Sequence, residues 1–304
     1  MIYMVYTLTL NPAIDYVVAL DNLEIGKINR SENENIYFGG KGINVSLILS
    51  ELGFESVATG FVAGFTGEAL AKGISCDTIK SDFVKLKNGI TRINVKIRHG
   101  GETDINTSGP MIDENDINEL FEKLENISNE DWLILSGSVP SNLPQDIYEK
   151  IMQRLKPKGV RFVVDAQGGL LLSTLKYNPF LIKPNADELG EIFSVEIENN
   201  EDAVRYAKEL RKMGAQNVLV SLGKDGAVLS DEKDNIYYLP VCKGDAVDTV
   251  GAGDSMLAGF IAGYLLNGDY NYALRLATAC GGATAFSQGL ANRKDIENLM
   301  EQLA

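Results

Sequence analysis

The sequence contains little cysteine and almost no histidine, with three cysteines and one histidine in 304 residues. Cys76, Cys242 and Cys280 lie far apart and form no Cys-x-x-Cys pair, which argues against a disulfide framework and against a zinc site. His99 lies in the polar turn 98–102, so a Ser-His-Asp triad or a multi-histidine metal site has little to draw on. These shortages argue against zinc enzymes and serine hydrolases.

Positive charge and long apolar runs are also scarce. Lys and Arg number 28 against 42 Asp and Glu, a net charge of -14, which argues against nucleic acid and anionic membranes as partners. No run reaches the roughly 18 to 20 apolar residues that span a bilayer. The apolar start, residues 1–10, has no basic segment and no cleavage site, so we interpret it as a buried first strand. We expect a soluble, cytoplasmic protein in which any phosphate ligand meets a local group of cations or main-chain N–H donors.

The order of apolar and amphipathic segments predicts an α/β fold. With 45% hydrophobic residues, the chain can bury a large core as one domain, residues 1–304. Short apolar runs at 132–135, 160–164, 180–182 and 218–220 alternate with amphipathic stretches such as 145–155 and 201–213. This alternation is typical of a doubly wound, mostly parallel sheet flanked by helices. Ligands of such sheets bind beyond the carboxyl ends of the strands, here the loops after Leu10, Leu135, Val164, Ile182 and Val220.

Two segments interrupt this rhythm and predict a small β-sheet lid. Residues 91–98 alternate, with Ile93, Val95 and Ile97 on one face, and turn at Gly100-Gly101 into a second strand, as in an antiparallel hairpin. Residues 14–20 and 35–38 also have the pattern of short strands. We expect a lid formed by about 12–38 and 90–107 that covers a substrate or a second subunit.

The most informative motif is Asp248-Thr249-Val250-Gly251-Ala252-Gly253-Asp254, which leads into an apolar segment with the character of a buried helix. Small residues at Gly251, Ala252 and Gly253 allow a ligand to approach the main chain, and the free N–H groups of a first helical turn bind anions. Asp254 would repel a phosphate unless it takes a proton from the group that attacks it. An anion site with a base indicates phosphoryl transfer; the alternative is a tight turn with Asp254 as a residue that favours the helix start.

A second glycine cluster, Gly39-Gly40-Lys41-Gly42-Ile43-Asn44, precedes a predicted helix. Its glycines permit close backbone approach, while Lys41 and Asn44 offer a cation and an amide for sugar hydroxyls or a phosphate. The spacing is neither that of a Walker A loop nor that of a dinucleotide-binding fingerprint. A plain glycine turn is the alternative.

Two further loops follow predicted strands. In Lys183-Pro184-Asn185-Ala186-Asp187-Glu188, Asn185 can cap the next helix, and Glu188 can instead face the crevice and hold Mg²⁺ through water. Residues 221–226, Ser-Leu-Gly-Lys-Asp-Gly, form either a turn or a nucleotide-binding edge.

Taken together, the motifs resemble the two signatures of the ribokinase-like, or PfkB, carbohydrate kinases. The resemblance covers nearly the whole chain. Within the family, the sequence is similar to the branch that contains the 1-phosphofructokinases and tagatose-6-phosphate kinases. It rests on the two glycine clusters and on five further segments, 9–15, 91–92, 136–140, 183–185 and 221–223.

The resemblance implies a role for each matching residue. Asp254 is implied as the base, and the N–H groups of Gly251, Ala252 and Gly253 as donors to the transferring phosphoryl group. The sugar site implied by the resemblance comprises Asp15, Gly39, Gly40, Asn44 and Ser138. Lys41 and Arg92 are expected to meet the phosphate of the sugar, with Lys27 and Arg30 of the lid reaching it from either subunit. The ATP and magnesium site implied by the family comprises Lys183, Asn185, Glu188, Ser221, Gly223 and Gly226.

The activity implied is ATP-dependent, Mg²⁺-dependent phosphorylation of a ketose phosphate, with fructose 1-phosphate, converted to fructose 1,6-bisphosphate, as the expected substrate. A tagatose-6-phosphate kinase or a 6-phosphofructokinase of the same family is the nearest alternative. A sugar-phosphate sensor without turnover is the alternative from another class, and an intact Asp254 argues against it. We also expect a homodimer joined through the lid, because a half-buried sheet has an apolar face that needs cover.

Overall fold

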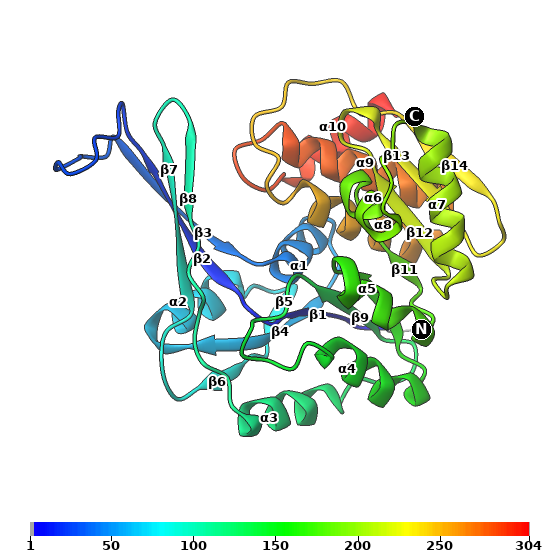
Figure 1. Ribbon diagram of the computed structural model, residues 1–304, viewed down its shortest axis with the longest axis horizontal. Coiled ribbons are helices and arrows are strands. Elements are labelled where there is room, and N and C mark those ends of the chain that lie inside the picture. Colours follow the sequence, from blue (N-terminus) through cyan, green and yellow to red (C-terminus); the bar gives the residue numbers. More distant parts are fainter. Residues whose placement is uncertain (1–2, 304) are drawn as a thin grey trace.

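The computed structural model describes residues 3–303 and consists of a layered α/β body with a separate arm (Figure 1). Met1 and Ile2 of the predicted first strand, and Ala304, lie outside the described residues. The strands of the body are β1 (Val5–Thr9), β4 (Ser56–Ala63), β5 (Ile79–Ser81), β6 (Val84–Leu86), β9 (Trp132–Ser136), β10 (Arg161–Asp165), β11 (Leu181–Ile182), β12 (Asn217–Ser221), β13 (Ala227–Ser230) and β14 (Ile236–Leu239).

These strands form one 10-stranded sheet in the order β14-β13-β12-β11-β10-β9-β1-β4-β5, with β6 also paired to β4. The pairs from β12 to β5 are parallel, and β13 and β14 add an antiparallel edge. Adjacent residues of each strand face opposite layers, so Leu133 and Leu135 belong to one apolar cluster and Trp132 and Ile134 to the other. The predicted doubly wound, mostly parallel sheet is confirmed.

Helices cover both faces of this sheet. One cluster contains buried residues of α3 (Glu114–Leu124), α4 (Ile147–Leu155), α5 (Gly168–Thr174), α6 (Ala186–Phe193) and α7 (Asn200–Lys212). The other contains α1 (Lys41–Glu51), α8 (Ala252–Asn267), α9 (Tyr270–Ala285) and α10 (Arg293–Gln302). α2 (Gly64–Ile74) packs in a third cluster under the arm. α8 is buried from Asp254 to Gly263, as its uniformly apolar sequence predicts.

The arm in the upper left of Figure 1 is a 4-stranded sheet in the order β3-β2-β7-β8. Its strands are β2 (Ala13–Ala19), β3 (Asn33–Gly39), β7 (Arg92–Arg98) and β8 (Glu102–Ile105). β7 and β8 form the predicted antiparallel hairpin, and the sheet coincides with the two segments predicted as a lid. We call this sheet the lid below.

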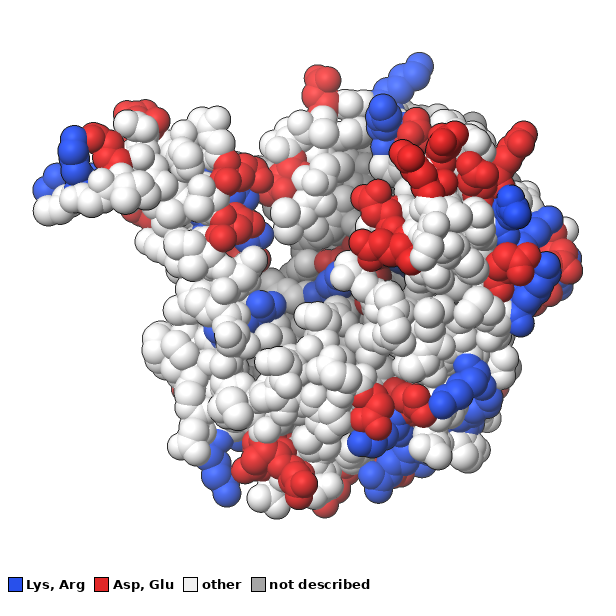
Figure 2. Space-filling view, viewed as in Figure 1, with Lys and Arg blue, Asp and Glu red and all other residues white. Residues whose placement is uncertain are grey.

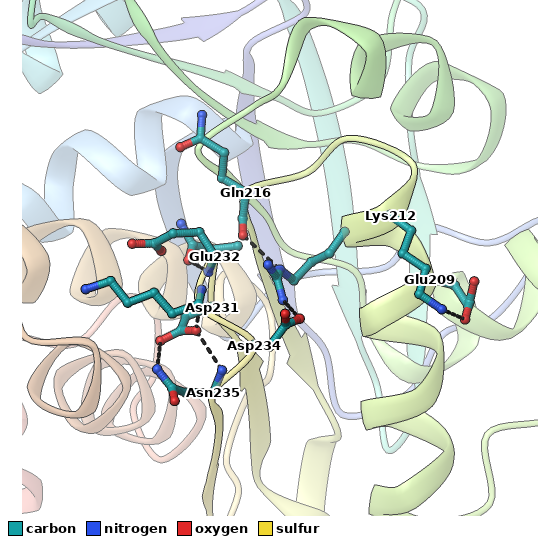
Figure 3. A network of polar contacts seen from close by, with 10 residues as sticks. Glu209, Lys212, Gln216, Asp231, Glu232, Asp234 and Asn235 are labelled. Atoms are coloured by element: carbon teal, nitrogen blue, oxygen red, sulfur yellow. Dashed lines mark hydrogen bonds and ion pairs between the residues drawn. The ribbon is translucent and has the colours of Figure 1, made fainter.

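At the opposite edge of the body, a polar network ties the turn after β13 to α7 and β12 (Figure 3). The carboxylate of Asp231 accepts hydrogen bonds from the N–H groups of Lys233 and Asn235 (both 2.9 Å), from Asn235 Nδ2 (2.9 Å) and from the Tyr237 hydroxyl (3.2 Å). Arg211 donates to Gln216 O and to Asp234. This network joins the turn after β13 to the neighbouring helix and strand.

Among residues 3–303, no helix combines the length and the apolar character that crossing a bilayer requires.

Candidate active site

The loops after β1, β9, β10, β11 and β12 lie at one edge of the main sheet, where the carboxyl ends of the parallel strands meet. Figure 2 shows a hollow between the lid and the body, with basic and acidic side chains at its floor. The first turns of α1 and α8 meet there, because Asn44 of α1 bonds to Asp254 of α8. The two glycine motifs, far apart in sequence, therefore form one site.

The turn before α8 has the shape of an anion site. Gly251 precedes the helix with φ 80°, a left-handed conformation that favours glycine, and a Cβ there would lie 2.7 Å from Leu290 Cδ2. The N–H of Ala252 donates to Thr249 O (3.2 Å), whereas no described residue accepts from the N–H groups of Gly251 and Gly253. Two of the three predicted donors are thus available to a ligand, and the third closes the turn.

Asp254 lies in the first turn of α8 and is 7% exposed. Its Oδ2 accepts one hydrogen bond, from Asn44 Nδ2 at 2.7 Å. Burial, followed by repulsion from Asp165, raises the pKa of the Asp254 carboxyl to about 6, although Asn44, Lys41 and Lys183 oppose the shift. The result is a carboxylate that gains and loses a proton close to physiological pH, as a general base requires.

Asp165, at the end of β10, gathers the two lysines of the site. Lys41 Nζ is 3.4 Å from both carboxylate oxygens and Lys183 Nζ is 3.6 Å from Oδ1. Burial alone would lower the pKa of Lys41, but Asp165, Asp254 and Glu188 outweigh it and raise the pKa. A Cβ on Gly253 would lie 3.3 Å from Lys183 Nζ, so this amine lies against the anion turn. The long ion pairs leave both ammonium groups with donors for a phosphate.

Asn185 and Glu188 form a capping box at the start of α6. The Asn185 side chain accepts from Glu188 N (2.7 Å), and Glu188 Oε2 accepts from Asn185 N (3.0 Å). Gln167, in the loop after β10, donates to Glu188 Oε1 (2.7 Å). The capping alternative therefore describes the local structure correctly, while the magnesium role of Glu188 stays a prediction. The described residues contain no cluster of three metal-binding side chains.

The loop after β12 lies beside Asn185, because Ser221 forms a parallel bridge with it. Gly223 is exposed with open space around it, whereas a Cβ on Gly226 would lie 2.2 Å from Leu239 O. Of the two glycines, Gly223 can border a nucleotide directly, and Gly226 serves to close the turn.

The remaining predicted residues of the sugar site line the junction of lid and body. Gly39 and Gly40 connect β3 to α1, and a Cβ on Gly40 (φ 133°) would lie 2.6 Å from Thr9 Cγ2. Arg92 Nε donates to Asn11 O (3.2 Å), and burial lowers the pKa of its guanidinium. Ser138 is exposed in the loop after β9.

Lys27 and Arg30 are not brought to this site within the chain. They lie in the exposed connection between β2 and β3, which projects from the far end of the lid in Figure 1, and Lys27 pairs with Glu24.

Four polar residues of the cleft were not among the site residues predicted from the sequence. They are Asp165 and Gln167 of the body, and Asn94 and Lys96 of the lid, which both contact Asp15. Asp165 directly follows Val164, whose loop was predicted to be informative, so an acid at that strand end was the available signal. Asn94 and Lys96 occupy the polar alternate positions of the strand whose apolar positions predicted the lid. Gln167 has no signal in the sequence, because its importance comes from contact with Glu188.

Several known proteins are similar to this chain over nearly its whole length. The family described as pfkB family carbohydrate kinase matches residues 4–297. The chain is 42% identical to the 1-phosphofructokinase of Bacillus subtilis (strain 168), covering 99% of this chain and 98% of that protein. It is 37% identical to a D-tagatose-1-phosphate kinase of Bacillus licheniformis, with coverage of 99% and 98%. The structure of Escherichia coli phosphofructokinase-2 in complex with substrates and products is similar with a TM-score of 0.92 at 27% identity, covering 99% of both chains.

Proposed function

The chain belongs to the pfkB family of carbohydrate kinases, and we propose that its reaction is transfer of the γ-phosphoryl group of ATP to the 6-hydroxyl of fructose 1-phosphate, giving fructose 1,6-bisphosphate. As a sugar kinase it is a phosphotransferase with an alcohol acceptor. The names of the Bacillus subtilis and Bacillus licheniformis relatives both place a phosphate on C1 of a ketose, which supports a ketose 1-phosphate as substrate.

The observation that carries the proposal is a buried carboxylate with a raised pKa at the mouth of an anion-binding turn. Asp254 takes the proton of the sugar hydroxyl as it attacks. The N–H groups of Gly251 and Gly253 and the amine of Lys183 face the charge of the transferring group. Phosphoryl transfer depends chiefly on positioning and electrostatics, so these groups are adequate for the reaction.

The nucleotide and its metal are assigned to the loops after β11 and β12. Asn185, Ser221 and Gly223 border the nucleotide, and Glu188 holds Mg²⁺ through water. A single buried carboxylate that keeps free lone pairs fits Mg²⁺, which retains several waters and is bound mainly by substrate phosphates. When bound, the ion neutralises charge on the phosphates.

At the sugar end, Asp15, Gly39, Gly40, Asn44 and Ser138 hold the ketose, while Arg92 and Lys41 meet its phosphate. Arg92 supports this role because its guanidinium is half-buried and donates only to the main-chain oxygens of Asn11 and Thr107 among the described residues. A half-buried cation without a carboxylate at ion-pair distance is suited to a dianion.

A homodimer joined through the lid is the second part of the proposal. One face of the lid carries an apolar row formed by Ile36, Tyr16, Val95 and Ile105, which the strand register places side by side. Ile36 is 61% exposed and Ile105 is 52% exposed. Ile93 is a different case, because it packs in the cluster beneath the lid. Lys27 and Arg30 would then reach the sugar phosphate of the partner subunit.

Sedimentation of Ile36→Asp and Ile105→Asp tests the dimer, with Lys85→Asp, an exposed change on β6, as the control. Both lid variants should become monomeric and bind the sugar phosphate more weakly, while the control keeps the wild-type state. A wild-type protein that sediments as a monomer and turns over normally would refute the dimer.

A coupled assay of the wild-type protein over phosphorylated and free ketoses, with ³¹P NMR of the product, tests the reaction. Fructose 1-phosphate should give fructose 1,6-bisphosphate at the highest kcat/KM. A preference for tagatose 6-phosphate or fructose 6-phosphate would show that the proposed substrate is wrong, while the proposed phosphoryl transfer would stand. Binding of sugar phosphates without turnover of any would establish the sensor alternative.

A further inference from the structure

The face of the lid that looks into the cleft carries a second ion pair, formed by the buried Lys96 and the partly buried Asp15. Asp15 of β2 lies opposite Asn94 of β7, and Lys96 is two residues farther along β7, so these three side chains share one face. Tyr37 of β3 lies opposite Asp15 on the same face, and a Cβ on Gly289 of the body would approach its ring to 3.1 Å. This face is therefore turned toward the body.

Lys96 is 9% exposed, although lysine is rarely buried. Its Nζ lies 3.5 Å from Asp15 Oδ2, and Asp15 is its one ion-pair partner among residues 3–303. Lys96 thus provides a buried positive charge whose position is set by a single carboxylate.

Asn94 holds the other oxygen of Asp15. Its Nδ2 donates to Asp15 Oδ1 at 2.8 Å, and its own Oδ1 accepts from Thr107 N at 3.3 Å. The Thr107 N–H fixes the orientation of the amide, so its NH₂ group must face Asp15. A Cβ on Gly39 would lie 3.0 Å from Asp15 Oδ2, so the absence of a side chain there leaves room for the carboxylate.

We propose that Lys96 and Asn94 are positioning residues, which hold the two oxygens of the Asp15 carboxylate and direct its free lone pairs at hydroxyl groups of the bound ketose. The inference rests on the proposed function and deepens it: the lid distinguishes ketoses by their hydroxyl pattern through this triad. Asp15 Oδ1 accepts one hydrogen bond, from Asn94, and Oδ2 forms an ion pair with Lys96, so both oxygens retain acceptor capacity for the sugar. A site built around a fixed acceptor discriminates strongly against a ketose whose hydroxyl does not reach it.

A double-mutant cycle between Lys96 and Asp15 tests the proposal. Lys96→Met should raise KM for fructose 1-phosphate about 10- to 100-fold, with kcat and KM for ATP within about twofold of wild type. Lys96→Arg should restore part of the loss. In the Asp15→Asn background, Lys96→Met should have little further effect, because Lys96 acts through that carboxylate. Lys85→Met, an exposed lysine of β6, is the matched control.

The split between KM and kcat gives a readout that a purely structural role would not move. A variant that only loses folded protein lowers the apparent kcat and leaves both KM values unchanged, whereas loss of a fixed acceptor for the ketose raises KM for fructose 1-phosphate alone.

Additive effects in the cycle, or an equal rise in KM for fructose 1-phosphate and for ATP, would overturn the proposal. If Lys96→Met does not fold, Asn94→Ala takes its place in the same cycle with the same expected results. A wild-type protein that phosphorylates no ketose phosphate contradicts the proposed function instead, whereas normal wild-type turnover with an unchanged KM in Lys96→Met contradicts the triad alone.

Discussion

Asp254 and Asp231 are both buried carboxylates of the α/β body. Asp254 lies at the cleft, whereas Asp231 lies in the turn after β13, at the antiparallel edge of the main sheet. Asp231, labelled in Figure 3, accepts four hydrogen bonds, one of them from Tyr237. Although burial alone would raise its pKa, the bonds from Asn235, Lys233 and Tyr237 lower it. Asp254 accepts one, from Asn44, and burial raises its pKa to about 6. The aspartate that stabilises a turn thus has its carboxylate oxygens occupied by hydrogen bonds, whereas the aspartate at the cleft keeps free acceptor capacity for a ligand.

The cations show the same contrast. At the sheet edge, Arg211 is paired with Asp234 at 2.6 Å. In the cleft, Lys41 and Lys183 stand 3.4 and 3.6 Å from a shared Asp165. Charges that are incompletely paired lower the stability of the ligand-free protein, and they gain partners when a phosphate binds. We therefore expect the arrangement of the cleft to favour ligand binding at the expense of stability.

The largest expected effect is on turnover. Asp254→Asn keeps the shape and the partner Asn44 but cannot take a proton, so kcat should fall about 10²- to 10⁴-fold while sugar phosphate binding, measured by calorimetry, is largely kept. Asp231→Asn is the matched control and should leave kcat per folded molecule unchanged. Near-normal turnover of Asp254→Asn would contradict the role of Asp254 as the base and would leave it as a residue that stabilises the start of α8.

The next effect concerns the sugar phosphate. Arg92→Ala should raise its KM about 10- to 100-fold, because a charge-assisted hydrogen bond to a dianion is lost, and should leave KM for ATP near its wild-type value. Arg98→Ala, on the same strand but already paired with Glu102 and Asp104, is the control. Equal weakening of both substrates would make Arg92 structural.

A smaller effect is the pH dependence of kcat/KM. Because the Asp254 carboxyl must be ionised to accept a proton and its pKa is about 6, kcat/KM should fall toward tenfold per pH unit below that value and level off above it. The sugar phosphate itself titrates near pH 6, so its binding to Asp254→Asn over the same range supplies the correction. A corrected profile that is flat from pH 5 to 8 would contradict the assignment.

Features of the fold and the site could be predicted from the sequence where they depend on residues close together along the chain. Buried strands such as β9 and β10 were predictable because their apolar runs are local, and the alternation of β7 likewise predicted the lid. The anion turn before α8 was predictable because glycine spacing reports local backbone conformation. The gathering of Lys41 and Lys183 around Asp165 was not, because it joins three segments whose packing no local pattern records.

The most direct test of the account is the effect of two substitutions on the free energy of unfolding of the ligand-free protein, measured by urea denaturation. The raised pKa of Asp254 means that ionisation opposes folding, so stability from this group is lost as pH rises through about 6. Asp254→Asn should therefore increase the unfolding free energy by about 1 to 3 kcal/mol at pH 8, and by less at pH 5. Asp231→Asn should decrease it by about 1 to 3 kcal/mol at pH 8, because paired donors lose their carboxylate. Opposite signs at pH 8 are the result that the account predicts, and a loss of stability in both variants would contradict it.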